Sequence, residues 1–311
     1  MIEFRIGLEN SFAKATGPKH RVIDVIRIAL WYAEIQHRLG LKSTYAVEKA
    51  LEPEAFFRSA EMGGAIRYHR NKWRNYRVGR HKPNRDLVKR VEKAVPGTEH
   101  LLNHILWEVL TRRIDLDDFF NTGIYRLSPE VQFVLVDFTY TELKRRHDLS
   151  SLAHLKRLKM LERRAGLDAL AVLTALFMYA VEHFSSEDAY RIGFSLRRVL
   201  LITVSSWPFL GLSDYLFRFY FATVLSQSTY ETKILPKLLD FDFVKAINYL
   251  NHKILCLEDL NIIGGDLSKI RHVKLDILEG YYPDKIMKLP PGFLIDRYSF
   301  TLSGACFIDI F

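Results

Sequence analysis

The sequence predicts a mainly α-helical protein with three parts: a region of short basic helices over residues 1–112, an α-helical bundle over 113–260, and a small irregular or β segment over 261–311. Apolar residues recur at spacings of three and four over long stretches, which is the helical period. Residues that start and stop helices interrupt these stretches at intervals of 10 to 20 residues. With 49% hydrophobic residues in 311, the chain can bury sizeable cores.

The first region is predicted from its helix boundaries. Gly40, Gly79 and the pair Pro96–Gly97 stand where helices end, and Ser43 and Asn84 stand where N-cap residues are expected. The predicted helices are Arg21–Leu39, Thr44–Leu51, Ala65–Arg77, Arg85–Val95 and one that opens at Thr98 and continues to Leu110.

The helix that opens at Thr98 places His100, His104 and Glu108 four residues apart on one face. Two imidazoles and a carboxylate are possible metal ligands. However, the glutamate of the HExxH motif is missing, and three ligands on one straight helix diverge over two turns. We therefore predict a polar helix edge here and no metal site.

The second region has longer and more apolar segments. The predicted helices are Phe133–Leu143, Leu152–Leu161, Leu167–His183, Asp188–Ser205 and Asp214–Leu225. Aromatic residues at 217, 219, 220 and 221 occupy more than one face of the last helix, so we expect neighbours to cover it. After Asp266 the helical period fades, Tyr298 and Phe300 begin an alternating pattern, and the apolar end CFIDIF is expected to pack against the bundle or a partner.

Basic residues are concentrated in one stretch. Residues 67–96 hold eleven Lys and Arg against two acids, an excess of nine that equals the formal net charge of the whole chain. A local field of this kind attracts a polyanion. On a helical wheel one stripe contains Arg67, Arg70, Arg74 and Arg77. The opposite side contains Ile66, His69, Trp73 and Tyr76, so we predict that Trp73 is structural.

A second basic tract covers residues 144–164, with eight Lys and Arg against two acids. A charge run on a helix is usually a solvated face, and we predict that here.

The run NKWRNYRVGRHKPNRDLVKRVEKA, residues 71–94, resembles the second half of a Cro/repressor-type helix-turn-helix domain. The matching residues are Trp73, Gly79, Arg80, Pro83, Leu87 and Val91. The chain departs from the pattern upstream, because the interval back to Gly40 exceeds the length of a first helix and turn.

The resemblance implies a helix in the major groove, with base-reading and phosphate-binding side chains. The implied readers are Arg67, Arg70, Asn71, Arg74 and Asn75, and the implied phosphate contacts are Arg80, Lys82 and Arg85. Lys72 and Arg77 complete the candidate set. The alternative interpretations of this basic region are a solvated face and a contact with an acidic protein.

Motifs of known enzyme sites are absent from the sequence, including phosphate-binding glycine loops, the GxSxG elbow and paired cysteines. The acidic turn at Asp115–Asp118 is typical of a helix-capping loop. We therefore expect no catalytic residues, no metal and no cofactor.

Localisation is predicted from two negative findings. The first residues lack the basic start and apolar run of a secretory signal. The longest uncharged apolar run, Val199–Leu212, is shorter than the roughly 20 residues that span a bilayer. We expect a cytoplasmic protein without a membrane partner.

These observations favour a DNA-binding protein, a regulator or a component of a larger assembly, with DNA rather than RNA as its nucleic acid. The bundle would then provide a homodimer interface or bind a protein partner. The alternative is a non-catalytic effector or adaptor of a bacterial defence or toxin system that acts through RNA or a nucleoprotein. A third interpretation is an enzyme with a noncanonical site.

Overall fold

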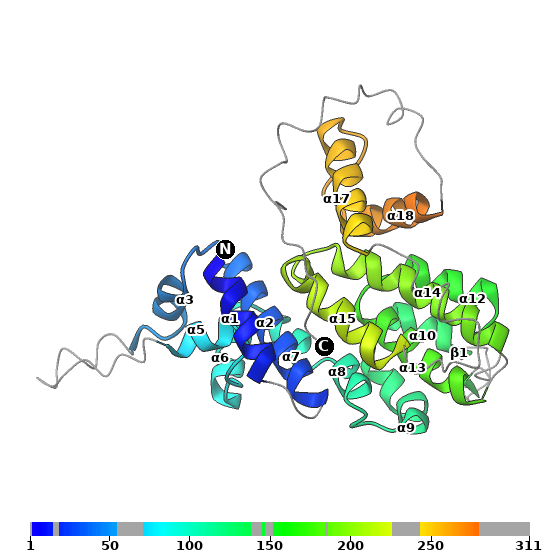
Figure 1. Cartoon of the computed structure of the whole chain (residues 1–311), viewed down its shortest axis with the longest axis horizontal. Helices are drawn as coiled ribbons and strands as arrows, with labels where there is room; N and C mark the ends of the chain where they lie inside the picture. Colours follow the sequence, from blue (N-terminus) through cyan, green and yellow to red (C-terminus); the bar gives the residue numbers. More distant parts are fainter. Residues whose placement is uncertain are drawn as a thin grey trace, which may run out of the picture. The chain divides into compact units, whose positions relative to one another are not determined.

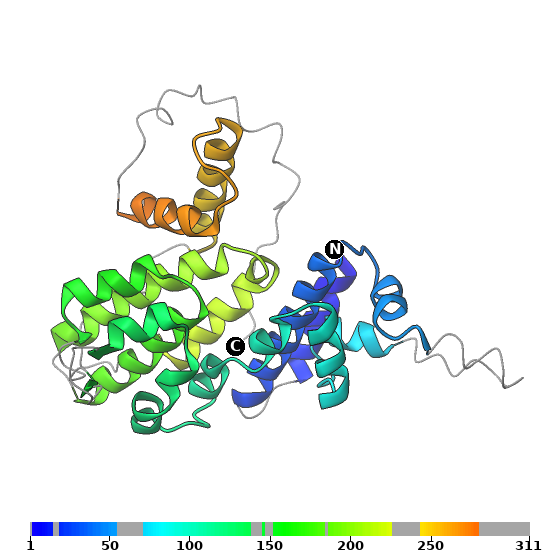
Figure 2. The ribbon, with the colours of Figure 1, turned by 180° about the vertical axis from the view of Figure 1, so that it is seen from behind.

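The computed structural model describes residues 2–14, 19–54, 71–137, 145–146, 152–183, 186–225 and 243–279. These residues are mainly α-helical, as the sequence predicts (Figures 1 and 2). The chain forms two compact units, Met1–Tyr249 and Leu250–Phe311.

The N-terminal part of the first unit is a set of mostly short helices. They are α1 (Ile2–Lys14), α2 (Lys19–Arg38), α3 (Thr44–Leu51), α5 (Lys72–Arg77), α6 (Arg85–Ala94), α7 (Thr98–Leu102), α8 (Ile105–Leu110) and α9 (Leu116–Asn121). The predicted N-cap residues cap α3 and α6. Ser43 Oγ accepts from Ala46 N at the start of α3, and Asn84 Oδ1 accepts from Leu87 N at 2.8 Å at the start of α6. Asp115 caps α9 in the same way, so the acidic turn is a capping loop.

Five of these helices, α2, α3, α5, α6 and α7, share an aromatic core. The Trp31 and Trp73 rings stack with centroids 6.1 Å apart, and Tyr76 meets both edge-on. Apolar residues of α3 and α6, including Val47 and Val91, surround the rings. Trp73 is 1% exposed, so the prediction that it points inward is confirmed.

The predicted helix from Thr98 to Leu110 is wrong, because the chain breaks between α7 and α8. His104 lies in extended backbone at the break, and its ring nitrogen Nδ1 accepts from Leu106 N at 3.1 Å. Trp107 Nε1 donates across the break to the carbonyl oxygen of Leu101 at 2.8 Å. The histidine is therefore an N-cap residue and not part of a continuous helical face.

The second part of the first unit contains the longer helices. The elements are η1 (Gly123–Arg126), α10 (Pro129–Leu135), β1 (Val136–Asp137), β2 (Arg145–Arg146), α12 (Leu155–Arg163), α13 (Leu167–His183), α14 (Ser186–Val204), η2 (Phe209–Leu212) and α15 (Ser213–Thr223). Helix α13 has the predicted bounds, and every residue from Ala169 to Met178 is buried. It packs against α14 and α8, so it connects the bundle with the short-helix part.

The predicted helix Phe133–Leu143 is wrong at Val136 and Asp137, and residues 138–143 lie outside the described ranges. Helix α10 ends at Leu135, and β1 pairs antiparallel with β2. Arg157 stabilises the C-terminal end of α10, because its Nη1 donates to the carbonyl oxygen of Val134 at 3.0 Å. A short apolar run such as 133–136 has no period that distinguishes helix from strand.

Helix α15 carries the aromatic cluster of residues 217–221. Phe219 and Tyr220 are buried, and the Tyr220 hydroxyl lies 2.9 Å from Thr174 Oγ1 of α13. Phe221 is 40% exposed. The predicted self-association of the bundle stays a prediction.

Helix α17 (Phe243–Asp259) begins in the first unit, and the second unit contains the rest of it together with α18 (Leu267–Leu278). The prediction that the helical period fades after Asp266 is wrong, because residues Leu267–Leu278 form α18. Asp266 instead caps α18 by accepting from Ser268 N at 2.9 Å. The predicted strand near Tyr298 and the CFIDIF end lie outside the described residues.

No single helix in the described ranges is long and apolar enough to cross a membrane. Two consecutive helices, Glu187–Val204 and Phe209–Thr223, together have the length and composition of a membrane-spanning helix, but the chain bends by 114° between them.

Candidate nucleic-acid interface

The basic surface predicted from the sequence is built on α5, α6 and the turn between them. Gly79 shapes this turn with a φ of +70°, a backbone conformation that favours glycine. A Cβ atom added at Gly79 would lie under 3.0 Å from the backbone O, Cα and C atoms of Val25. The turn is therefore pressed directly on α2, and this contact fixes the position of the residues that follow.

The structure describes eight of the ten candidate residues, because Arg67 and Arg70 lie outside the described ranges. Four of the eight are exposed cations: Arg74, Arg80, Lys82 and Arg85. Among the described residues none of the four forms an ion pair, and Arg80 makes only a long hydrogen bond of 3.4 Å from Nε to Ser11 Oγ. Their charges are therefore open to a polyanion.

Lys72 is different, because its ammonium group binds both carboxylate oxygens of Glu52 at 2.7 and 2.8 Å. The same carboxylate accepts from Trp73 Nε1 at 2.9 Å. Arg90 of α6 also contacts Glu52 and pairs with Glu54. Glu52 therefore joins α3 to α5 and α6, and Lys72 has mainly a structural contact in this arrangement.

The remaining candidates are only partly available. Asn71 is exposed at the start of α5, whereas Asn75 Nδ2 faces His81 Nδ1 at 3.4 Å. Arg77 is half-buried and lies near Tyr32, where burial raises the pKa of the phenol to about 12 and the arginine charge opposes this shift. Helix α5 is six residues long in the described part of the chain, and Arg74 is its exposed cation there.

Two exposed cations that the sequence reasoning missed lie on α6. Lys89 and Lys93 follow Arg85 at intervals of four residues, so all three share one helix face. The four-residue spacing is visible in the sequence. However, counting Lys and Arg over residues 67–96 treats these lysines in the same way as Arg90, which pairs with acids.

The second basic tract is distributed differently. On α12, Lys156 and Arg163 are exposed, whereas the Arg157 and Arg164 guanidinium groups donate to backbone carbonyls. The one acid of this helix, Glu162, is buried and bound by Arg198 and Ser195 of α14. Side chains of α12 thus serve partly to hold neighbouring helices together.

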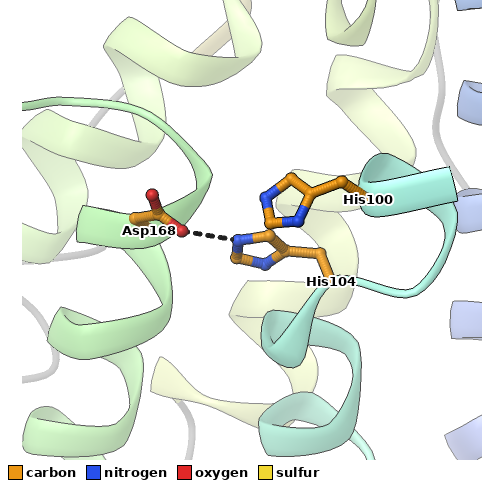
Figure 3. A group of neighbouring side chains, drawn as sticks. All are labelled: His100, His104 and Asp168. Carbon is orange, nitrogen blue, oxygen red and sulfur yellow. Dashed lines mark hydrogen bonds and ion pairs between the residues drawn. The ribbon is translucent and has the colours of Figure 1, made fainter. Parts of the chain in front are cut away.

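A second candidate site brings together His100, His104 and Asp168 (Figure 3). The histidines come from α7 and the start of α8, and the carboxylate comes from the first turn of α13. One ligand atom of each residue lies within 4.8 Å of the others. This grouping differs from the set considered in the sequence, because Glu108 instead binds both terminal nitrogens of Arg126.

Hydrogen bonds already occupy the possible metal-binding atoms of His104 and Asp168. Because His104 Nδ1 accepts from Leu106 N, the proton of the neutral ring is on Nε2, which donates to Asp168 Oδ1 at 2.8 Å. The other carboxylate oxygen accepts from Ser128 N at 3.0 Å. A cation at Nε2 would have to displace this proton. The donor set therefore fits a buried His–Asp hydrogen bond better than a metal centre.

These hydrogen bonds also explain the charge states. Burial raises the pKa of Asp168, but the hydrogen bonds from His104 and Ser128 outweigh it and lower the pKa to about 2. Burial lowers the pKa of His104, with Asp168 opposing this shift and the charges of His100 and Arg126 adding to it. The pair is consequently a neutral imidazole with a carboxylate at neutral pH.

We expect stability to fall on acidification because of this pair. Below the ordinary histidine pKa of about 6.5, the unfolded chain takes up a proton that folded His104 resists, at up to about 1.4 kcal/mol per pH unit. The loss from Asp168 follows at lower pH, between its ordinary pKa and about 2. Urea unfolding at pH 7.5 and 5.5 measures the first loss.

The matched variants are His104→Gln, which removes the buried titrating group, and His183→Gln, which removes an exposed one. The pH-dependent loss should shrink in the first variant and persist in the second. An equal loss in wild type and His104→Gln would contradict this explanation.

Comparison with known proteins adds no relative: no family model, no curated protein and no solved structure matches this chain.

Proposed function

We propose that this protein binds nucleic acid, with DNA as the first candidate, through the turn between α5 and α6 and the outer face of α6. The observation that carries the proposal is the set of exposed cations, Arg74, Arg80, Lys82 and Arg85, which form no ion pair within the described part of the chain. Surface cations near acids commonly pair with them, as Arg90 does with Glu54. A group of unpaired cations is the expected footprint of a polyanion partner.

Rigidity of the support is a second argument. The turn sits on α2 through Gly79, and α5 is anchored by the buried rings of Trp73 and Tyr76. Cations held on a fixed backbone lose less conformational entropy on binding than cations on a free loop. In this proposal the bundle is the half that associates with itself or with a protein partner, and the protein acts in the cytoplasm as a regulator or as part of a larger assembly.

The test is a salt titration of binding to a labelled DNA duplex. Arg80→Ala combined with Lys82→Ala should weaken binding and lower the slope of log affinity against log salt by about 0.9 for each lost phosphate contact. The matched control is Lys156→Ala combined with Arg163→Ala, which removes the same charge from exposed sites on α12.

Equal losses in the two double variants would mean that only net charge matters, and the proposed interface would be abandoned. An RNA of the same length, run in parallel, separates the DNA proposal from the alternative of an effector that acts through RNA. Tighter binding to RNA at every salt concentration would favour that alternative.

A further inference from the structure

Helix α6 carries a regular row of cations along its outer face. Arg85, Lys89 and Lys93 are all exposed, and each is four residues from the next. At 1.5 Å per residue, neighbouring positions are about 6 Å apart along the helix axis. The opposite face buries Leu87, Val88 and Val91 in the aromatic core, so the row lies in the middle of the exposed surface.

Asp86 is an exposed acid on α6 itself, next to Arg85, and the other acids near this row are occupied. Both oxygens of Glu92 accept backbone N–H groups after α6, with Oε2 accepting from Glu99 N at 2.7 Å, and these hydrogen bonds lower the pKa of Glu92 against the effect of burial. Glu52 and Glu54 are engaged with Lys72 and Arg90. In the described residues the three cations of the row form no ion pair.

The row continues at the start of α6 into the turn. Arg80 and Lys82 precede the helix by a few residues and are also exposed. They lie before the N-terminal end of α6, where the helix dipole adds a partial positive charge of the same sign. Five cations thus follow one another from the turn to the end of α6.

We infer that this row, Arg80, Lys82, Arg85, Lys89 and Lys93, follows a single phosphodiester backbone and binds it with little regard to base sequence. The inference rests on the proposed function and specifies its substrate class. Lysine acts on phosphate as a point charge and lacks the planar fork that arginine uses to recognise a base edge. Contacts with phosphates set position and affinity but carry no direct sequence information.

The amide of Asn75 does not join the row. Asn75, an implied base reader, directs its Nδ2 toward His81. Binding to a phosphodiester backbone also explains why the row continues past Arg85 to Lys89 and Lys93. The helix-turn-helix resemblance places no phosphate-binding residue at these two positions.

The test is Lys89→Ala combined with Lys93→Ala in the full chain. Alanine is a strong helix former and both sites are exposed, so the fold should be retained, which the far-UV circular dichroism spectrum and the urea midpoint check. With a duplex the log–log salt slope should fall by about 1.8, and with a single strand by about 1.4. A scrambled duplex should give the same affinity and the same loss.

The outcomes separate this inference from the proposed function. Absence of salt-dependent binding by the wild-type chain would overturn both. If the wild-type chain bound and the Lys89/Lys93 variant kept the same salt slope, the inference that the row binds a phosphodiester backbone would be overturned, and the proposed function would stand. A preference of about 100-fold or more for one sequence over its scramble would overturn the sequence-independent contact, because each base-pair mismatch costs about 1–3 kcal/mol only where bases are read. Lys156→Ala with Arg163→Ala is again the charge-matched control, and its slope should stay near that of wild type.

Discussion

Replacing Trp73 by alanine is expected to lower the free energy of unfolding by about 3–5 kcal/mol. The indole is 1% exposed, stacks on Trp31 and meets Tyr76 edge-on. The substitution also removes the Nε1–H that Glu52 accepts. Equilibrium urea unfolding, followed by circular dichroism, measures the change.

Trp207 provides the matched control, because it is 49% exposed. Trp207→Ala should cost less than about 1 kcal/mol, as substitutions at exposed sites usually do. If Trp73→Ala cost as little, and Trp73 fluorescence changed strongly when nucleic acid was added, the indole would be a base-stacking residue and the described core would be wrong.

Gly79→Ala should have an effect of similar size, about 2–5 kcal/mol. A side chain at positive φ costs roughly 1–2 kcal/mol, and forcing a methyl group into a packed contact costs about 1–3 kcal/mol more. The obstacle here is the backbone of Val25, which cannot rotate away. Because the turn carries Arg80 and Lys82, the variant should also bind nucleic acid less tightly than wild type at a temperature where both are folded.

Gly40→Ala separates the cost of a side chain at positive φ from the cost of the contact with the Val25 backbone. Gly40 also has a positive φ, +65°, but a Cβ there would meet no atom within 4 Å. It should therefore show the conformational cost alone. Equal losses of stability in the two variants would mean that the close approach to Val25 contributes nothing, and the rigid turn would lose its main support.

Local signals account for what could be predicted from the sequence. Ser43, Asn84 and Gly40 act on backbone groups a few residues away, so the boundaries of α2, α3 and α6 follow from the residues themselves. The inward position of Trp73 follows from the helical period in the same way.

Long-range partners account for most of what could not be predicted. The break at His104 is stabilised by Asp168, 64 residues further on, and the end of α10 by Arg157. Among the candidate cations, Lys72 is neutralised by Glu52 from another helix. A charge count finds the basic surface, but only the structure distinguishes paired cations from exposed ones that form no ion pair in the described ranges. Helix α18 was not predicted although its signal is local. Its N-cap residue is Asp266, but the apolar residues that follow have a weaker helical period.

The salt dependence of nucleic-acid binding by the unmodified chain tests the central claim most directly. Affinity for a duplex of about 30 base pairs should fall steeply between 50 and 200 mM salt, with a log–log slope of about −4 to −5 if the five cations from Arg80 to Lys93 each contact one phosphate. A slope near zero, or no binding at 50 mM salt by a chain whose fold is intact, would contradict the claim that this surface binds nucleic acid.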